Sequence, residues 1–353
     1  MACKNSINLK SAKIRIGDGS PVFVIAEISA NHGRSFNKAV ELIRKAKKAG
    51  ADAVKFQTYT ADTHTIDVDN KYFKINHPKW GGQTLYQLYD KSYAPWDWFK
   101  KLKKVADDIE IMFFSAATDK ASVDLLESIG VSMHKLASFE LVDLELIKYI
   151  AKTKKPLILS TGMATFGEIK EAVDTARKFG TKDLILLKCV SSYPADPGNM
   201  NLKTMADMKK RFNCPVGLSD HTMGTTVSAA AVALGAVAIE KHFTLSRKAK
   251  TSDNFFSIEP KELKDLVQNI RVVETALGKV NYGLTDDEKK NRVFRRSLFI
   301  VEDIGKGQLL TKENIRSIRP GMGLSPNNLN KVLGKKAKKY IKKGTPLKWG
   351  LIG

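Results

Sequence analysis

The chain has 353 residues, of which 43% are hydrophobic and 27% charged, a composition that suits one globular domain of about 250 residues plus a smaller one. No apolar run approaches the roughly 20 residues that cross a bilayer, so a membrane-spanning protein is excluded at this level. The formal net charge is +22, but no recognised nucleic-acid motif or interleaved aromatic residues accompany it, and we expect no specific nucleic-acid partner.

Residues 1–282 repeat one unit, which consists of a short apolar strand, a polar turn and an amphipathic helix. The strands are nearly continuous apolar runs, as expected for parallel strands buried on both faces. Expected helices such as Phe36–Ala49 end beside a glycine, and a long helix over Pro260–Leu277 closes the series. Eight such units predict a (β/α)8 barrel (TIM barrel), with an open doubly wound sheet as the alternative. The predicted strands are Val22–Ser29, Ala53–Gln57, Ile111–Ala116, Met133–Ser138, Pro156–Thr161, Leu184–Ser192, Val216–His221 and Ala236–Thr244.

The remaining residues are expected to form a charged linker, 283–292, and a second small domain, 293–353. From Thr285 to Gly353 there are 17 Lys and Arg against 6 Asp and Glu, so +11 of the +22 lies in this part. A domain of this size has only a marginal core, and we expect it to dock on a partner surface. Its expected elements are short strands or turns at Arg296–Ile300, Leu309–Thr311, Ile315–Arg319 and Thr345–Leu351 and a helix near Ser325–Leu333.

Nearly every predicted strand of the barrel ends in polar residues. The carboxyl ends of these strands converge on one mouth of the barrel, where catalytic residues collect. Charged residues inside apolar strands are costly to bury unless they are paired or bind a ligand. We therefore expect an active site at this mouth, built from Glu27, Lys55, Ser115, Lys135, Ser138, Ser160, Ser191, Tyr193, Ser219, His221, Glu240 and His242.

These residues divide by chemistry. The lysines and serines supply the cations and hydroxyls that a phosphate or carboxylate needs. His221 and His242 end adjacent strands, so their imidazoles can converge on one divalent ion, with Glu27 and Glu240 nearby. Mixed nitrogen and oxygen ligands with open positions favour Mn²⁺, with Mg²⁺ or Co²⁺ as alternatives, over a closed zinc site. Such an ion would polarise an aldehyde oxygen.

Ordered motifs run along the whole chain. They are VIAEISANHG (Val24–Gly33), GADAVKFQT (Gly50–Thr58), HKLAS (His134–Ser138), LILSTGMAT (Leu157–Thr165), SSYPADP (Ser191–Pro197), VGLSDHTMG (Val216–Gly224), IEKHFTLSR (Ile239–Arg247), SIEPKEL (Ser257–Leu263), RRSLF (Arg295–Phe299) and RPGMGLSP (Arg319–Pro326). Together these motifs resemble those of the sialic acid synthase family, and one group of its members, the pseudaminic acid synthases, most of all. The last two resemble the antifreeze-like (SAF) module of the same family.

The resemblance implies a metal-dependent condensation of phosphoenolpyruvate with an open-chain acetamido sugar, in a domain-swapped homodimer. His221 and His242 would hold the metal, and Glu27 would handle the water or proton. The residues implied for phosphoenolpyruvate are Lys55, Ser115, Lys135, Ser138, Ser160, Ser191 and Ser219. Those implied for the sugar are Tyr193, Glu240, Asp253 and Arg319, the last from the partner subunit.

Two stretches bear on the sugar. TLYQLYDKSYAPWDW (Thr84–Trp98) and TSDNFFSIEP (Thr251–Pro260) resemble pseudaminic acid synthases, which favours 2,4-diacetamido-2,4,6-trideoxy-L-altrose. The alternatives are N-acetylmannosamine or another diacetamido sugar, as in N-acetylneuraminate and legionaminate synthases. The chain departs from the family pattern in two places. Ala116 and Thr118 remove a hydroxyl and an aromatic side chain after the third strand, and Ser191 stands where members that use N-acetylmannosamine often carry Asn.

Two further alternatives remain open. A synthase that acts on arabinose 5-phosphate would lack the C-terminal module, and a non-catalytic protein that binds a polyanion or carbohydrate would have lost the site residues. For location we expect the cytoplasm, because the N-terminal residues lack the apolar core of a signal peptide. The three cysteines, Cys3, Cys189 and Cys214, are scattered without pairing, which favours a reducing compartment.

Overall fold

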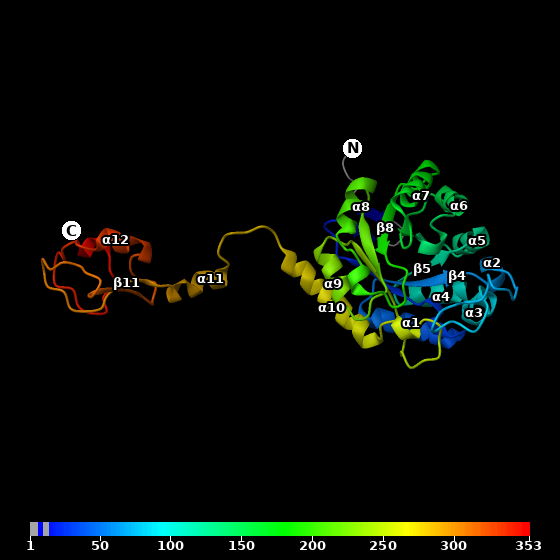
Figure 1. The fold of residues 1–353 in the computed structure, drawn as a ribbon, viewed down its shortest axis with the longest axis horizontal. Helices are drawn as coiled ribbons and strands as arrows, with labels where there is room; N and C mark the ends of the chain where they lie inside the picture. The colour runs from blue at the N-terminus through cyan, green and yellow to red at the C-terminus, as the bar shows by residue number, and fades with distance from the viewer. Residues whose placement is uncertain (1–5, 10–13) are drawn as a thin grey trace. The chain divides into compact units, whose positions relative to one another are not determined.

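The computed structural model describes residues 6–9 and 14–353 and divides the chain into two compact units, Met1–Gly278 and Lys279–Gly353. The first unit is a closed barrel of eight parallel strands surrounded by helices (Figure 1), which confirms the predicted (β/α)8 barrel and excludes the open sheet. Its strands are β3 (Phe23–Glu27), β4 (Ala53–Thr58), β5 (Met112–Ala117), β6 (His134–Leu136), β7 (Leu157–Ser160), β8 (Leu184–Cys189), β9 (Val216–Asp220) and β10 (Ala238–His242).

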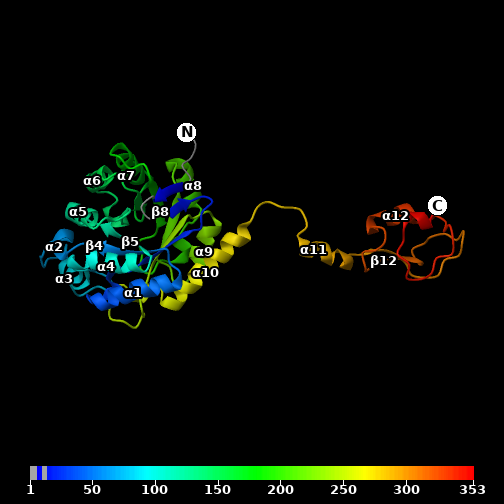
Figure 2. The same ribbon diagram turned by 180° about the vertical axis from the view of Figure 1, so that it is seen from behind.

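The helices cover the outside of this barrel. Ser35 caps the first turn of α1 through a bond from the backbone N–H of Lys38, and Gly50 ends the helix with a φ of 92°. Helix α10 packs beside α1 and α9 (Figure 2). Among the described residues, no helix is both long enough and apolar enough to cross a membrane. The helices of this unit are α1 (Phe36–Ala49), α2 (Ala61–His64), α3 (Leu85–Ser92), α4 (Asp97–Asp108), α5 (Lys120–Ser128), α6 (Leu144–Lys152), α7 (Phe166–Lys178), α8 (Thr204–Phe212), α9 (Thr226–Ala233) and α10 (Pro260–Leu277).

Two apolar layers result from the alternation of side chains along the strands. In β3, Val24 and Ala26 pack outward against the helices, whereas Phe23 and Ile25 fill the barrel interior. The same alternation directs Glu27, the next inward residue, into the barrel at the carboxyl end of the strand. The inward positions of the other strands follow this rule, so the fold brings the polar strand ends to one mouth.

A strand pair that sequence reasoning missed contributes to the opposite end of the interior core. Strands β1 (Ser6–Leu9) and β2 (Ile14–Gly17) pair antiparallel. Their side chains Ile7, Leu9 and Ile16 are at most 2% exposed and belong to the same core cluster as Phe23. Because Phe23 begins β3, this apolar contact lies at the end of the barrel away from the polar mouth.

The second unit has a core of its own around β11 (Ser297–Ile300) and β12 (Ile315–Ile318), which pair antiparallel. The segments Leu309–Thr311 and Thr345–Leu351, expected to be short strands or turns, form no continuous strand and contribute only the single bridges at Leu309 and Pro346. Proline has no N–H to continue a ladder. The helices of this unit are α11 (Asp286–Asn291), inside the expected linker, and α12 (Leu329–Val332).

Candidate active site

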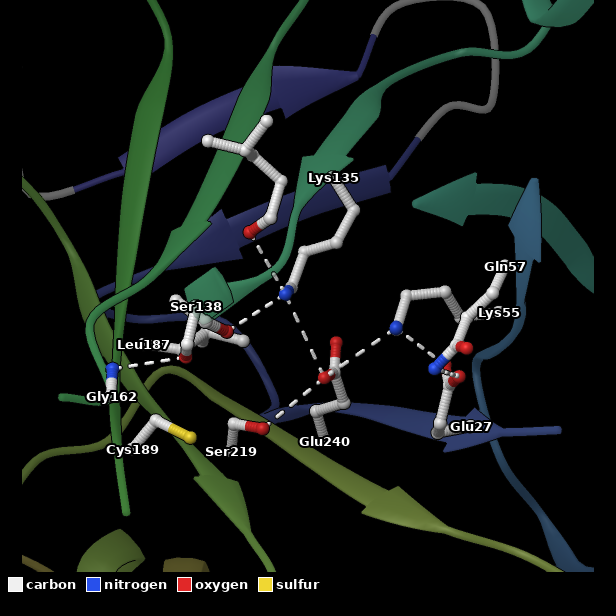
Figure 3. A network of polar contacts seen from close by, with 12 residues as sticks. Glu27, Lys55, Gln57, Lys135, Ser138, Gly162, Leu187, Cys189, Ser219 and Glu240 are labelled. Atoms are coloured by element: carbon white, nitrogen blue, oxygen red, sulfur yellow. Dashed lines mark hydrogen bonds and ion pairs between the residues drawn. The ribbon is translucent and has the colours of Figure 1, made fainter. Parts of the chain in front are cut away.

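Four charged side chains meet inside the mouth of the barrel, and we call them the mouth cluster: Glu27, Lys55, Lys135 and Glu240 (Figure 3). Lys55 Nζ lies 2.5 Å from Glu27 Oε2 and 3.7 Å from Glu240 Oε1, and Lys135 Nζ lies 3.8 Å from the same Glu240 oxygen. Each of the four side chains is at most 5% exposed. Charges this far from water persist only when opposite charges compensate them, and here two ammonium groups face two carboxylates.

The electrostatics of the cluster differ between its two carboxylates. Burial raises the pKa of Glu27 to about 7, against the opposing effect of the Lys55 ammonium. Burial also acts to raise the pKa of Glu240, but the charges of Lys135 and Lys55 outweigh it and hold that pKa below its ordinary value. Glu240 therefore stays ionised, whereas Glu27 can take up and release a proton near neutral pH.

Two of the predicted serine hydroxyls contact the mouth cluster. Lys135 Nζ donates to Ser160 Oγ at 2.7 Å, and Ser219 Oγ donates to Glu240 Oε1 at 3.2 Å. Oε2 of Glu240 is buried with no hydrogen-bond partner. A buried acceptor without a partner is costly, so the cluster offers an unused hydrogen-bonding position.

Gly162 allows three strand ends to approach closely beside the cluster. Its backbone N–H donates to Ser138 Oγ at 2.9 Å. A Cβ at this position would collide with the hydroxyls of Ser138 and Ser191 and would lie 3.2 Å from Cys189 Sγ. Because Gly162 has no side chain, Ser138 and Ser191, two of the serines predicted to bind phosphoenolpyruvate, can both lie close to it.

The two predicted metal ligands are also close together, with their ring centroids 5.3 Å apart. Nδ1 of His221 lies 2.8 Å from the carbonyl oxygen of Val190; because a carbonyl only accepts, this nitrogen carries the proton. Burial acts to lower the pKa of His221, but its contacts with Cys189 and the Val190 carbonyl outweigh burial and raise that pKa, so Nε2 offers a lone pair only in the neutral ring. Nδ1 of His242 is buried with no partner. Burial, with further help from His221, holds the pKa of His242 well below its ordinary value, so the ring is neutral, as metal binding requires.

The two imidazoles are nitrogen donors of the kind that a divalent ion binds. Within residues 6–9 and 14–353, no three or more His, Cys, Asp or Glu side chains form a group that could hold a metal ion. The metal and its two histidine ligands therefore stay a prediction.

A buried ion pair joins the two strands that carry these histidines. Lys241 Nζ lies 2.8 Å from Asp220 Oδ2 and donates to the carbonyl oxygen of Thr222 at 2.7 Å. Asp220 also accepts from the N–H and hydroxyl of Thr222 and from the hydroxyl of Ser228. The pair faces away from the mouth cluster, because each member alternates with the inward residues on either side of it. It therefore fixes the register of β9 and β10 from behind.

An aromatic wall, which consists of Trp80, Tyr193, Phe255 and Phe256, lies against the histidines. The ring centroids of Tyr193 and Phe256 are 4.5 and 4.8 Å from the nearer imidazole. Trp80 lies 5.7 Å from Tyr193 and 5.9 Å from Phe255, and its indole N–H donates to the carbonyl oxygen of Ser252 at 2.7 Å. The wall gives one side of the site an apolar surface.

The structure corrects the prediction for Ser115. This side chain is fully buried, and its hydroxyl accepts a hydrogen bond from Thr58 at 2.7 Å. Phe114, the residue before it, belongs to the barrel-interior core. Because side chains alternate across a strand, Ser115 points to the helix layer, and the inward residue at this strand end is Ala116.

The two remaining predicted sugar residues, Asp253 and Arg319, belong to different units. Asp253 accepts from the hydroxyl of Ser29 and, at 3.4 Å, from the N–H of Ala30, and burial raises its pKa. It therefore joins the loop after β3 to the loop after β10. Arg319 is exposed in the second unit, and its contact with a sugar stays a prediction.

Sequence reasoning missed three polar residues at the mouth. Gln57 Nε2 donates to Glu27 Oε1 at 3.1 Å, and Cys189 Sγ lies 3.9 Å from Nδ1 of His221. Glu140 follows β6 by four residues; burial raises its pKa to about 7, and its Oε2 is buried without a hydrogen-bond partner. The rule that selected the other strand ends could have found Gln57 and Cys189, but Glu140 lies one turn beyond the strand.

Known proteins resemble the chain in both units. Residues 42–282 match the NeuB family and residues 295–352 match the SAF domain. A pseudaminic acid synthase of Campylobacter jejuni is 43% identical over 93% of this chain and 96% of that protein. An N,N'-diacetyllegionaminic acid synthase of Legionella pneumophila is 37% identical over 94% and 95%. The solved structure of an N-acetylneuraminic acid synthetase from Leptospira borgpetersenii is 33% identical, with a TM-score of 0.72, and the match covers 81% of this chain and 94% of that chain.

Removal of the Lys241 charge should destabilise the barrel strongly. Lys241→Met leaves Asp220 buried without its counter-ion, and we expect a loss of about 3–5 kcal/mol in the free energy of unfolding. The matched control is Lys209→Met, because Lys209 pairs with Asp18 at the same 2.8 Å but with side chains 31% and 43% exposed; its loss should stay below about 1 kcal/mol. Equal losses in urea titrations of the two variants would contradict the role given to the buried pair.

Proposed function

The chain belongs to the NeuB family and is a nonulosonic acid synthase, and we propose that it condenses phosphoenolpyruvate with 2,4-diacetamido-2,4,6-trideoxy-L-altrose to give pseudaminic acid and phosphate. The observation that carries this proposal is the mouth cluster, in which two buried lysines pair with two carboxylates, Ser160 and Ser219 contact the cluster, and Oε2 of Glu240 has no hydrogen-bond partner. Such an arrangement suits a small substrate that carries both a phosphate and a carboxylate.

Phosphoenolpyruvate would bind against the lysine side of the cluster. The ammonium groups of Lys55 and Lys135 supply two positive charges inside the barrel, and they are held in place by Glu27 and Glu240. The phosphate and carboxylate of the substrate would accept hydrogen bonds from these lysines and from the surrounding hydroxyls. The serines proposed for this role are Ser138, Ser160, Ser191 and Ser219.

The reaction joins C3 of phosphoenolpyruvate to the aldehyde carbon of the sugar, adds water at C2 and releases phosphate. We propose that Glu27 takes the proton from this water, since its pKa is about 7 and Gln57 holds its other oxygen. His221 and His242 would hold a divalent ion, Mn²⁺ first and Mg²⁺ or Co²⁺ as alternatives. When bound, the ion supplies a Lewis acid for the aldehyde oxygen.

The aromatic wall supports a sugar with a methyl group at C6. Phe255 and Phe256 follow Asp253 after a single intervening residue, Asn254, and both belong to the wall that contacts the histidines. A methyl group packs against such a surface, whereas a hydroxyl would lose its hydrogen bonds to water there. The greater identity with the pseudaminic acid synthase than with the legionaminic acid synthase agrees with this choice.

A second copy of the chain would complete the site. Apolar side chains are exposed in the loops that follow β6, β7 and β9, namely Phe139 (59%), Met163 (61%) and Met223 (46%). We propose that the SAF unit of a partner subunit covers this rim and brings its Arg319 to the sugar. A guanidinium suits that contact because it donates several hydrogen bonds in a fixed geometry.

Phosphate release from phosphoenolpyruvate tests the reaction and the sugar together. With Mn²⁺ present, we expect release with the trideoxy diacetamido altrose and much slower release with N-acetylmannosamine or arabinose 5-phosphate. Release with N-acetylmannosamine at an equal kcat/KM would overturn the role of the aromatic wall. Silence with every acetamido sugar would contradict the proposed condensation.

Mixed dimers test the trans role of Arg319. His242→Ala should be inactive, and Arg319→Ala should show a raised KM for the sugar. Co-expressed in equal amounts, the two should recover activity in about a quarter of all sites, because each heterodimer has one intact site. As a control, wild type is co-expressed with His242→Ala, which measures the activity that remains when intact subunits are diluted by inactive ones. The activity of the co-expressed variants is compared, at a low sugar concentration, with the activities of the two variants measured separately. If co-expression gives no higher activity, Arg319 does not act in trans.

A further inference from the structure

A cavity of about 720 Å³ lies on the outer side of the barrel, between α7 and α8. Its volume falls in the range of roughly 300–1,000 Å³ that small-molecule sites occupy. Lys188 lines it from β8 and alternates with Leu187, which fills the barrel interior, so the lysine faces away from the mouth cluster. The lining residues are Thr161, Ala164, Ile169, Lys188, Gly198, Asn201, Leu202, Lys203, Thr204, Met208 and Leu234.

The charged side chains that line this cavity are all positive. Lys188 and Lys203 line it, and the lining contains no Asp or Glu. Lys188 is half-buried; its Nζ donates to the carbonyl oxygen of Cys189 at 3.0 Å, and in the part of the chain that the structure describes no carboxylate forms an ion pair with it. Burial lowers the pKa of Lys188. An ammonium withdrawn from water without a counter-ion is unfavourable, so an anion in the cavity would be stabilised.

The start of α8 adds to the positive electrostatic potential in the cavity. Lys203 and Thr204 form the first positions of this helix, both line the cavity, and no side chain caps this end. The N-terminus of a helix carries a partial positive charge that favours anions. The rest of the lining is largely apolar and includes Ile169 of α7 and Met208 of α8.

From these observations we propose that the cavity between α7 and α8 binds a small anion, which places a carboxylate or phosphate between Lys188 and Lys203 and an apolar body against Ile169 and Met208. This site is separate from the mouth cluster and independent of the proposed reaction. It backs onto the mouth, since Thr161 follows Ser160 and Lys188 precedes Cys189.

Isothermal titration of the full chain with phenyl phosphate tests this site. In Lys188→Met the stem of the side chain is kept and the charge removed, and this variant should bind phenyl phosphate at this site at least about tenfold more weakly than wild type. Parallel titrations with inorganic phosphate and benzoate separate the contributions of phosphate and carboxylate. Benzyl alcohol, which has no charge, should not bind.

The matched control is Lys178→Met, which removes an exposed lysine from the end of α7 outside the cavity and should bind phenyl phosphate as wild type does. If Lys188→Met does not fold, Thr204→Asp provides a second variant, because a carboxylate at the cavity should exclude the anion. Identical isotherms for wild type and either cavity variant would overturn the proposal. So would an equal loss in Lys178→Met, or a crystal structure with phenyl phosphate that shows the ligand only beside Lys55 and Lys135.

Discussion

The burial of two ammonium groups inside the barrel is the constraint on which the site depends. Lys55 and Lys135 are at most 3% exposed, and neither could remain charged there without Glu27 and Glu240. The strands β3, β4, β6 and β10 deliver these four residues because each carries one of them at an inward position near its carboxyl end. Replacement of such a cluster by apolar residues is often neutral or favourable for stability, so its presence indicates a use in binding and catalysis.

Other features of the barrel support this arrangement from outside. Gly162 lets Ser138 and Ser191 approach, and the pair formed by Asp220 and Lys241 holds the two histidine-bearing strands in register. The apolar strand pair at the far end of the interior places the hydrophobic contacts away from the charges. The barrel therefore separates its functions along its axis, with packing at one end and polar chemistry at the other.

The sequence was sufficient to predict the barrel, because eight apolar runs alternated with amphipathic helices, and the mouth cluster, because charged residues ended those runs. It misplaced Ser115, since a strand end alone does not reveal which residue faces inward; Ala116 takes that position. Glu140 was missed because its contact with the mouth arises from a turn beyond β6. The aromatic wall joins residues more than a hundred positions apart, and the spacing of those residues carries no signal of their contact.

The most direct measurement is the effect of phosphoenolpyruvate on the free energy of unfolding of wild type and of Lys135→Met. If the buried lysines are kept for this substrate, wild type should gain about 2.7 kcal/mol at a concentration one hundred times the dissociation constant. Lys135→Met, with its ammonium group removed, should gain almost nothing at the same concentration. An equal gain in both proteins would contradict the account, because it would show that the mouth cluster does not hold phosphoenolpyruvate.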